Sequence, residues 1–303
     1  MHEFELSPLE AGRVTALPQY YPTFLIDESD GRKRSARKPT SLKLVGVDCI
    51  FSSSQDSVLL RRAGHGVGLD VCQDYAGLSI GADGKRRIAV MADGVSCAVA
   101  SQSVANIVTH KAMELLRELG ENILDEKTAL RVIETVHLDL AARFDRKLLM
   151  PELEEGYAQH FAADECREAV RRGGYGASTL SFMVLNGDRV DACMFGSEVF
   201  LIFRNNELIV RHANKAKCPS QLAAANSFDP KEIVLRSANV QKGDVVVLGT
   251  DGFLRRGVVD DAEALIAIID QKIKDGYTLS QALYEVFLNF PSRDDRTMIV
   301  LYV

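Results

Sequence analysis

The sequence predicts an α+β domain in which antiparallel sheets carry helices on their outer faces. Strand-like segments and hairpin turns occur in both halves of the chain, with long amphipathic helical patterns between them. Two more helical patterns precede a closing strand. Because hairpins outnumber strand–helix–strand crossovers, this order favours antiparallel sheets with helices packed outside them.

The first strands follow an N-terminal stretch with little periodicity. Residues 1–41 hold four of the eight prolines, so we expect an extended arm there and a folded domain over 42–303. Between 81 and 85, glycines and an aspartate predict a hairpin turn. The strands expected in this part of the chain are 42–48, 70–80 and 87–91.

Apolar residues three and four apart then predict an amphipathic helix over 99–119 that ends at Gly120. The same spacing predicts four more helices, at 127–149, 160–172, 262–273 and 279–288. The helix at 160–172 is shorter than those at 99–119 and 127–149.

The second half of the chain returns to strands. Asn186-Gly187 is a type I′ hairpin signal, and Asn205-Asn206 marks a second hairpin. Residues 212–230 show no regular pattern. The strands expected here are 179–185, 190–195, 199–203, 208–211, 245–248 and 298–302.

Composition narrows the class of protein. The chain has 303 residues, of which 47% are hydrophobic and 26% charged, which suits a globular protein with a sizeable core. Its net charge of −6 argues against nucleic-acid binding, and we interpret the basic run at 32–38 as a solvated linker. No apolar run reaches the length of about 18 residues that a membrane span needs.

The six cysteines are scattered, with no Cys-x-x-Cys pair, and the N-terminus does not resemble a secretory signal. We therefore expect no zinc site and a cytoplasmic location. We also expect a monomer.

Aspartates recur where strands end. Asp93 and Asp251 each follow an apolar strand and precede a glycine, Asp74 lies in the run Val71-Cys72-Gln73-Asp74, and Asp294-Asp295 precede the closing strand. A simple turn is the alternative interpretation of each Asp-Gly pair. If the carboxylates gather, they repel one another unless they take up protons or bind cations, and oxygen ligands suit magnesium and manganese. A two-metal site of this kind can lower the pKa of a bound water so that it attacks a phosphate.

Five short motifs follow one another along the chain. They are Gln73-Asp74, Ala92-Asp93-Gly94, Gly176-Ala177-Ser178-Thr179, Gly249-Thr250-Asp251-Gly252-Phe253 and Asp294-Asp295-Arg296-Thr297. Taken in this order, the motifs resemble the metal-dependent protein phosphatases of type 2C. The resemblance covers about 42–303, and the segment 64–74 looks most like a bacterial branch in which a Cys-Gln-Asp-like motif replaces Asn-Glu-Asp. It implies a four-layer α-β-β-α sandwich with two central antiparallel sheets.

The resemblance also implies two Mn²⁺ or Mg²⁺ ions at one end of the sandwich. Asp93 would bridge both ions and the Gly94 carbonyl would bind one of them. Asp251 and Asp294 would complete the other, and Asp74 would support the cluster directly or through a water. A bridging water would then attack the phosphorus in line, without a phosphoenzyme. The substrates would be phosphorylated proteins, such as the targets of a serine/threonine kinase.

The chain departs from the family pattern at several positions. Leu69 stands where the family has a phosphate-binding arginine, and Gln73 replaces a glutamate. His65 is the candidate to contact the phosphate or protonate the leaving oxygen, although an ordinary loop histidine is the alternative. Arg255 replaces an aspartate of a third metal site, so we expect no third ion of the usual type and propose Arg255 as a phosphate contact. The family's Gly-Asp-Ser is here 196–198, Gly-Ser-Glu.

Two other functions stay open at this point. One is a pseudophosphatase that keeps the fold and binds partners, which the lost arginine and the lost third-site aspartate favour. The other is a phosphohydrolase acting on a small phosphorylated metabolite. Retention of the four metal-site aspartates argues against the first, because an unused cluster of carboxylates is costly without ions.

Overall fold

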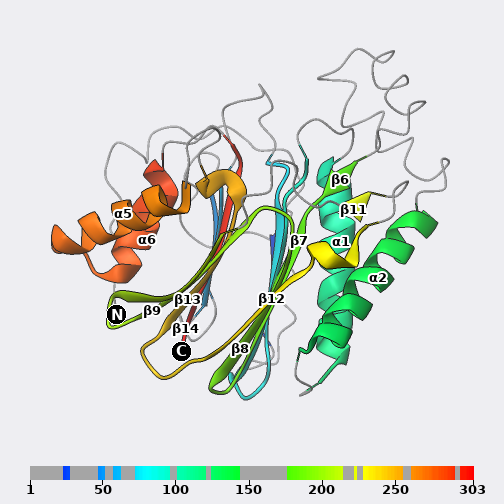
Figure 1. Cartoon of the computed structure of the whole chain (residues 1–303), viewed down its shortest axis with the longest axis horizontal. Coiled ribbons are helices and arrows are strands. Elements are labelled where there is room, and N and C mark those ends of the chain that lie inside the picture. Colours follow the sequence, from blue (N-terminus) through cyan, green and yellow to red (C-terminus); the bar gives the residue numbers. More distant parts are fainter. Residues whose placement is uncertain are drawn as a thin grey trace, which may run out of the picture.

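Two six-stranded sheets pack face to face in the computed structural model, and a pair of helices covers the outer face of each (Figure 1). The α+β class and the four-layer α-β-β-α sandwich are therefore confirmed. The structure describes residues 23–27, 47–51, 57–62, 72–95, 101–120, 124–143, 176–213, 222–223, 228–254, 261–290 and 294–303.

The first sheet has the strand order β1-β4-β5-β7-β8-β12. Strand β1 runs parallel to β4, and every other neighbouring pair is antiparallel. Strand β1 lies within the stretch 1–41, so the sheet begins earlier in the chain than the expected domain boundary at 42. The strands are β1 (Thr23–Asp27), β4 (Tyr75–Ile80), β5 (Arg86–Ala92), β7 (Leu180–Asn186), β8 (Arg189–Phe195) and β12 (Val234–Asn239).

The second sheet has the order β10-β9-β13-β14-β3-β2, and all its neighbouring strands are antiparallel. The strand expected over 42–48 meets β2 only at its last residues, and β3 was not expected at all. The strands are β2 (Val47–Phe51), β3 (Ser57–Arg62), β9 (Glu198–Arg204), β10 (Glu207–Ala213), β13 (Val245–Thr250) and β14 (Arg296–Tyr302).

A short separate pair joins β6 (Ala177–Ser178) to β11 (Leu222–Ala223), which lies within the range expected to be irregular. Helices α1 and α2 cover the first sheet, and α5 and α6 cover the second. The helix expected over 160–172 lies outside the described residues. The helices are α1 (Ser101–Glu118), α2 (Glu126–Arg143), α5 (Asp261–Lys274), α6 (Leu279–Asn289) and the short 3₁₀ helices η1 (Pro230–Glu232) and η2 (Asp251–Phe253).

Among the described helices, none combines the length and the apolar character that a membrane crossing requires.

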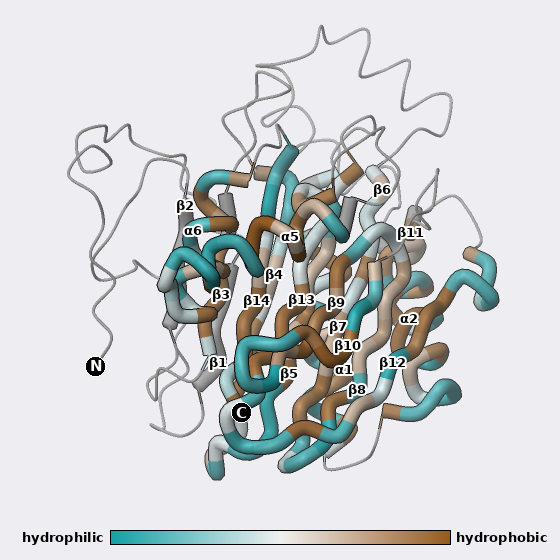
Figure 2. Tube along the Cα trace, turned by 60° about the vertical axis from the view of Figure 1, so that its left-hand side comes forward, coloured by the Kyte–Doolittle hydropathy of each residue, from teal (hydrophilic) through white to brown (hydrophobic). Residues whose placement is uncertain are grey.

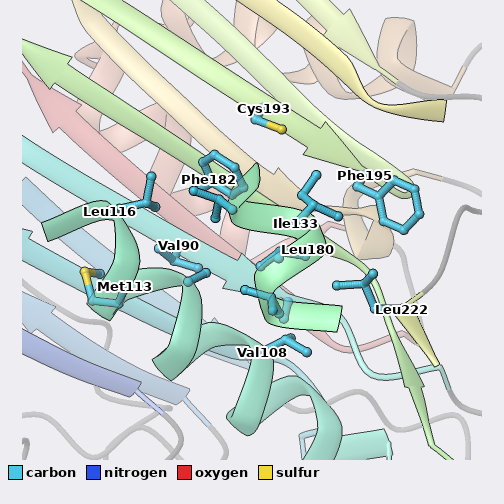
Figure 3. Packing of buried hydrophobic residues seen from close by; sticks show 14 of the residues in the cluster. Val90, Val108, Met113, Leu116, Ile133, Leu180, Phe182, Cys193, Phe195 and Leu222 are labelled. Carbon is cyan, nitrogen blue, oxygen red and sulfur yellow. The ribbon is translucent and has the colours of Figure 1, made fainter. Parts of the chain in front are cut away.

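Three apolar layers hold the sandwich together. Between α1–α2 and the first sheet, Phe182 and Phe195 pack with Leu116 and Ile133 (Figure 3). A second layer joins α5–α6 to the second sheet, and a third fills the space between the two sheets. Figure 2 shows these strands as a brown, apolar centre with teal turns at their ends. Each fully buried Leu or Phe side chain stabilises the fold by about 1.5–3 kcal/mol.

One of the two short hairpins has a different turn from the one that the sequence suggested. Asn186 pairs with Arg189, so Gly187 takes the first loop position, and it alone of the two loop residues has a positive φ, of 62°. That is the pattern of a type II′ turn, and the type I′ prediction for Asn186-Gly187 was wrong. The type I′ pattern occurs instead at Asn205 and Asn206, whose φ values are 51° and 66°.

Candidate active site

The side chains between the two sheets are apolar along most of the strands and polar at one end. Side chains alternate between the two faces of a strand, so a residue two positions from an inter-sheet residue also faces the other sheet. Leu78 and Ala76 lie in the inter-sheet layer, and Asp74 continues their row directly before β4. By the same rule Asp93 continues the row of Met91. The buried polar residues that extend this layer are Asp74, Thr179, Ser181, Glu198, Thr250 and Thr297.

Asp74 links the two sheets. Its side chain is fully buried, and its Oδ2 accepts hydrogen bonds from Thr250 Oγ1 (3.1 Å) and Thr297 Oγ1 (2.8 Å). Both threonines belong to the second sheet, at the end of β13 and near the start of β14. The Thr297 amide also donates to Thr250 Oγ1 at 3.0 Å, so the three residues hold one another in place.

Asp93 is fixed by the segment that carries the third motif. Its amide donates to Thr179 Oγ1 at 3.0 Å, and its carbonyl accepts from the Thr179 amide at 2.9 Å. Gly94 forms a bridge to Ser178. A Cβ on Gly94 would lie 2.7 Å from the Gln73 carbonyl oxygen, so only glycine lets the first and second motifs approach so closely.

Asp251 and the pair Asp294-Asp295 meet at the end of the second sheet. Asp251 begins η2 directly after β13. A Cβ on Gly252 would lie 1.8 Å from the Asp295 carbonyl oxygen, a distance that excludes any side chain there. Asp295 Oδ2 accepts a hydrogen bond from the backbone amide of Gln73, and this bond joins the segment before β14 to the first motif.

These five aspartates, which we call the acidic cluster, act on one another electrostatically. Removal from water and the charge of Asp295 raise the pKa of Asp74 to about 8, against the effect of the Thr297 hydrogen bond. The pKa of Asp93 is raised well above its usual value, first by loss of water and then by the charges of Asp74, Asp251 and Asp294. Carboxylates this close must hold protons or cations.

The donor atoms suit a divalent cation. Most are carboxylate oxygens, the ligands that magnesium and manganese prefer. One group also contains sulfur: ligand atoms of Cys72, Asp74 and Asp295 all lie within 4.8 Å of one another. The residues present therefore fit a metal centre, although which of them bind ions stays a prediction.

The structure brings together Asp74, Asp93, Asp251 and Asp294, the aspartates chosen from the sequence. The Gly94 backbone lies beside them through its bridge to Ser178. The positions of His65 and Arg255 lie outside the described residues.

Glu198 is a buried acid that the sequence analysis did not place in the site. It starts β9 in the row of Phe200, so it faces the first sheet, and it is fully buried. Loss of water raises its pKa to about 7, and the charge of Asp251 adds to this. The hydroxyls of Ser181 and Thr179 lie close enough to lower that pKa, yet neither makes a well-formed hydrogen bond to it.

Extending the predicted strand 199–203 back by one residue would have identified Glu198 as an acid in an inward-facing row. Asp295 was noted only as the neighbour of Asp294, and Cys72 only as part of the first motif. Their proximity depends on how β4 and β14 sit in different sheets, which the local pattern does not show.

Comparison with known proteins identifies the family of the chain. The family model described as protein phosphatase 2C matches residues 63–288. A putative protein phosphatase 2C 24 from Oryza sativa subsp. japonica is 28% identical over 104 residues, which span 33% of this chain and 33% of the rice protein.

Solved structures show the same fold. A bacterial serine phosphatase has 14% identity and a TM-score of 0.54, with 82% of this chain and 97% of that chain covered. The catalytic domain of the serine threonine protein phosphatase PstP, in complex with two manganese ions, has 15% identity and a TM-score of 0.50, with 81% and 97% covered. The assignment to a bacterial branch stays a prediction. Because the family model covers more than half of the sequence and the sandwich ends in the expected acidic cluster, the chain belongs to the protein phosphatase 2C family of metal-dependent protein phosphatases.

Proposed function

We propose that this protein is an active serine/threonine phosphatase that hydrolyses phosphoserine and phosphothreonine in proteins. The observation that carries the proposal is the meeting of aspartates from four separate stretches of chain at one end of the inter-sheet layer. Burying such a cluster without cations costs free energy of folding. Its presence therefore favours an active metal centre over an inactive protein that only binds partners.

Asp93, Asp251, Asp294, Asp74 and the Gly94 carbonyl would hold two Mn²⁺ or Mg²⁺ ions. When bound, such ions lower the pKa of a water and neutralise charge on the phosphate oxygens. Asp93 is suited to this role because Thr179 fixes its backbone from both sides. Asp74 is held by the hydroxyls of the second sheet, so its carboxylate keeps one orientation.

The reaction would pass the phosphoryl group to water. The water oxygen bonds to phosphorus as the bond from phosphorus to the serine or threonine oxygen breaks, and a proton from the water ends on that oxygen. Inorganic phosphate and the free hydroxyl are the products. We propose His65 and Arg255 as contacts to the phosphate in place of the family's arginine.

The test is hydrolysis of a phosphothreonine peptide with manganese, with magnesium and with chelator. Asp93→Asn is the diagnostic variant, and we expect it to lower kcat by about a thousandfold or more, as loss of a main charge-stabilising group does. Asp188→Asn is the matched control, because Asp188 is an exposed aspartate in the β7–β8 turn.

Metal-dependent phosphate release that Asp93→Asn abolishes and Asp188→Asn keeps would support the proposal. Near-normal turnover by Asp93→Asn at saturating manganese would contradict the site. If folded wild-type protein binds manganese and releases no phosphate from the peptide, a panel of phosphorylated metabolites decides between a metabolite phosphatase and a partner-binding protein.

A further inference from the structure

One thiol stands among the carboxylates of the acidic cluster. Cys72 is 5% exposed, and its Sγ lies within 4.8 Å of carboxylate oxygens of both Asp74 and Asp295. The three residues come from two elements, the segment before β4 and the segment before β14. The hydrogen bond from the Gln73 amide to Asp295 Oδ2 holds these two segments together.

Each of the two carboxylates is already oriented by the protein. Asp74 Oδ2 receives two threonine hydroxyls, and Asp295 Oδ2 receives the Gln73 amide. The thiol therefore faces carboxylates whose positions are fixed, rather than a mobile surface. A set of one sulfur and two carboxylate oxygens at this spacing is a ligand set for one cation, after small shifts toward bonding distances.

We propose that Cys72 is a thiolate ligand of a metal ion held with Asp74 and Asp295, which gives this centre a mixed sulfur–oxygen donor set. Binding forms a metal–sulfur bond and releases the thiol proton to solvent. Because thiolates select softer ions, the site takes zinc, cobalt or cadmium more tightly than an all-oxygen site would. The proposal rests on the metal centre proposed above, but not on turnover.

Cys193 provides the contrast that makes the proposal testable. It is also a buried, unoxidised cysteine, but it lies in the apolar layer against α1–α2, beside Phe182 (Figure 3). Burial, with the charge of Glu198, raises the pKa of its thiol far above the usual value. Cys193 therefore stays a thiol that packs as a small apolar side chain.

The experiment is a titration of the metal-free, reduced full-length protein with Cd²⁺, followed by the ultraviolet thiolate-to-cadmium charge-transfer absorption. Wild type and Cys193→Ser should both develop the band, and Cys72→Ser should lack it. Isothermal titration calorimetry with Cd²⁺ and with Mn²⁺ runs in parallel. We expect Cys72→Ser to weaken Cd²⁺ binding by about tenfold or more, because losing even a group that only supports a metal ligand lowers metal affinity by about 10–100-fold. Mn²⁺ binding should weaken less.

A band that persists in Cys72→Ser would come from another cysteine and would overturn the proposal. So would Cd²⁺ binding to wild type without any band. Circular dichroism checks that Cys72→Ser is folded, and Cys72→Ala replaces it if it is not. If neither wild type nor any variant binds a divalent cation, the proposed metal centre itself is contradicted. If wild type hydrolyses the peptide with Mn²⁺ but shows no cadmium–sulfur band, only the role of Cys72 is contradicted.

Discussion

The layer between the two sheets is built in two different ways along the same strands. Over most of its length it is apolar, with residues such as Leu78, Met91 and Phe200 fully buried. At one end the same alternating rows carry Asp74 and Glu198, equally buried. The apolar part stabilises the fold by removing carbon from water, and the polar end costs free energy unless protons or cations compensate the carboxylates. One strand arrangement thus supplies both the stability and the site.

The largest expected effect comes from changing the pH at the polar end. Folding raises the pKa of Asp74 from 3.8 to about 8, so the folded protein holds a proton that the unfolded chain releases. The contribution of Asp74 to the free energy of unfolding is therefore complete below about pH 4. It falls by roughly 5 kcal/mol as the pH rises toward 8. Urea unfolding of the chelated protein at pH 5 and pH 8 measures most of this fall, about 4 kcal/mol.

Added Mn²⁺ should reverse the loss at pH 8, because a cation replaces the proton. Asp74→Asn is the control: it removes this carboxyl together with its effect on the pKa of Asp93, whereas the lowered pKa values of His110 and His212, caused first by burial, are common to both proteins. A chelated wild type as stable at pH 8 as at pH 5, relative to Asp74→Asn, would contradict the assignment.

Next in size is a cavity in the apolar part. Phe200→Ala removes a fully buried ring between the sheets, and we expect a loss of about 3–5 kcal/mol in unfolding free energy. In contrast to the polar end, this loss should be the same with and without Mn²⁺ and nearly independent of pH. A loss that Mn²⁺ abolished would show that the two regions are not separable.

Glu198→Gln sharpens the comparison further. Folding raises the pKa of Glu198 from 4.5 to about 7, so its ionisation costs about 3 kcal/mol above pH 7 and nothing below about pH 4.5. Relative to wild type, the variant should gain stability between pH 5 and pH 8 in chelated protein. Equal pH dependence of the two proteins would mean that Glu198 does not titrate in this range.

The smallest effect is expected from Thr297→Val, which keeps the side-chain shape and removes one hydroxyl donor from Asp74. We expect a loss of about 1–3 kcal/mol, the cost of leaving a buried acceptor short of one hydrogen bond. Calorimetry should also show weaker Mn²⁺ binding. Thr109→Val, at a buried threonine of α1, is the matched control and should leave Mn²⁺ binding unchanged.

Local sequence patterns predicted the parts of the fold that local physics determines. The amphipathic spacing of α1 and the hairpin of β9 and β10 were found because each depends on residues close in sequence. Strand β1 was missed because β4, which it neighbours among the described strands, pairs with it in parallel from some 50 residues away. Strand β12 was missed because it is a largely exposed edge strand without a strict alternation.

The site divides in the same way. Asp93 and Asp251 were found because each stands between an apolar strand and a glycine, a signal contained in a few residues. That they meet Asp74 depends on the register of strands in two different sheets. The same non-local register places Cys72 beside Asp295, and no pattern within either segment contains that information.

The hydrogen bonds of Asp74 tie the sliding of the two sheets to the shape of the acidic cluster. Asp74 directly precedes β4 of the first sheet, and both hydroxyls that reach it belong to the second sheet. A slip of one residue along a strand is about 3.3 Å, enough to break both bonds at once. A change in the relative position of the two sheets therefore also changes the arrangement of the carboxylates. A force that shears the sandwich acts on the site as well.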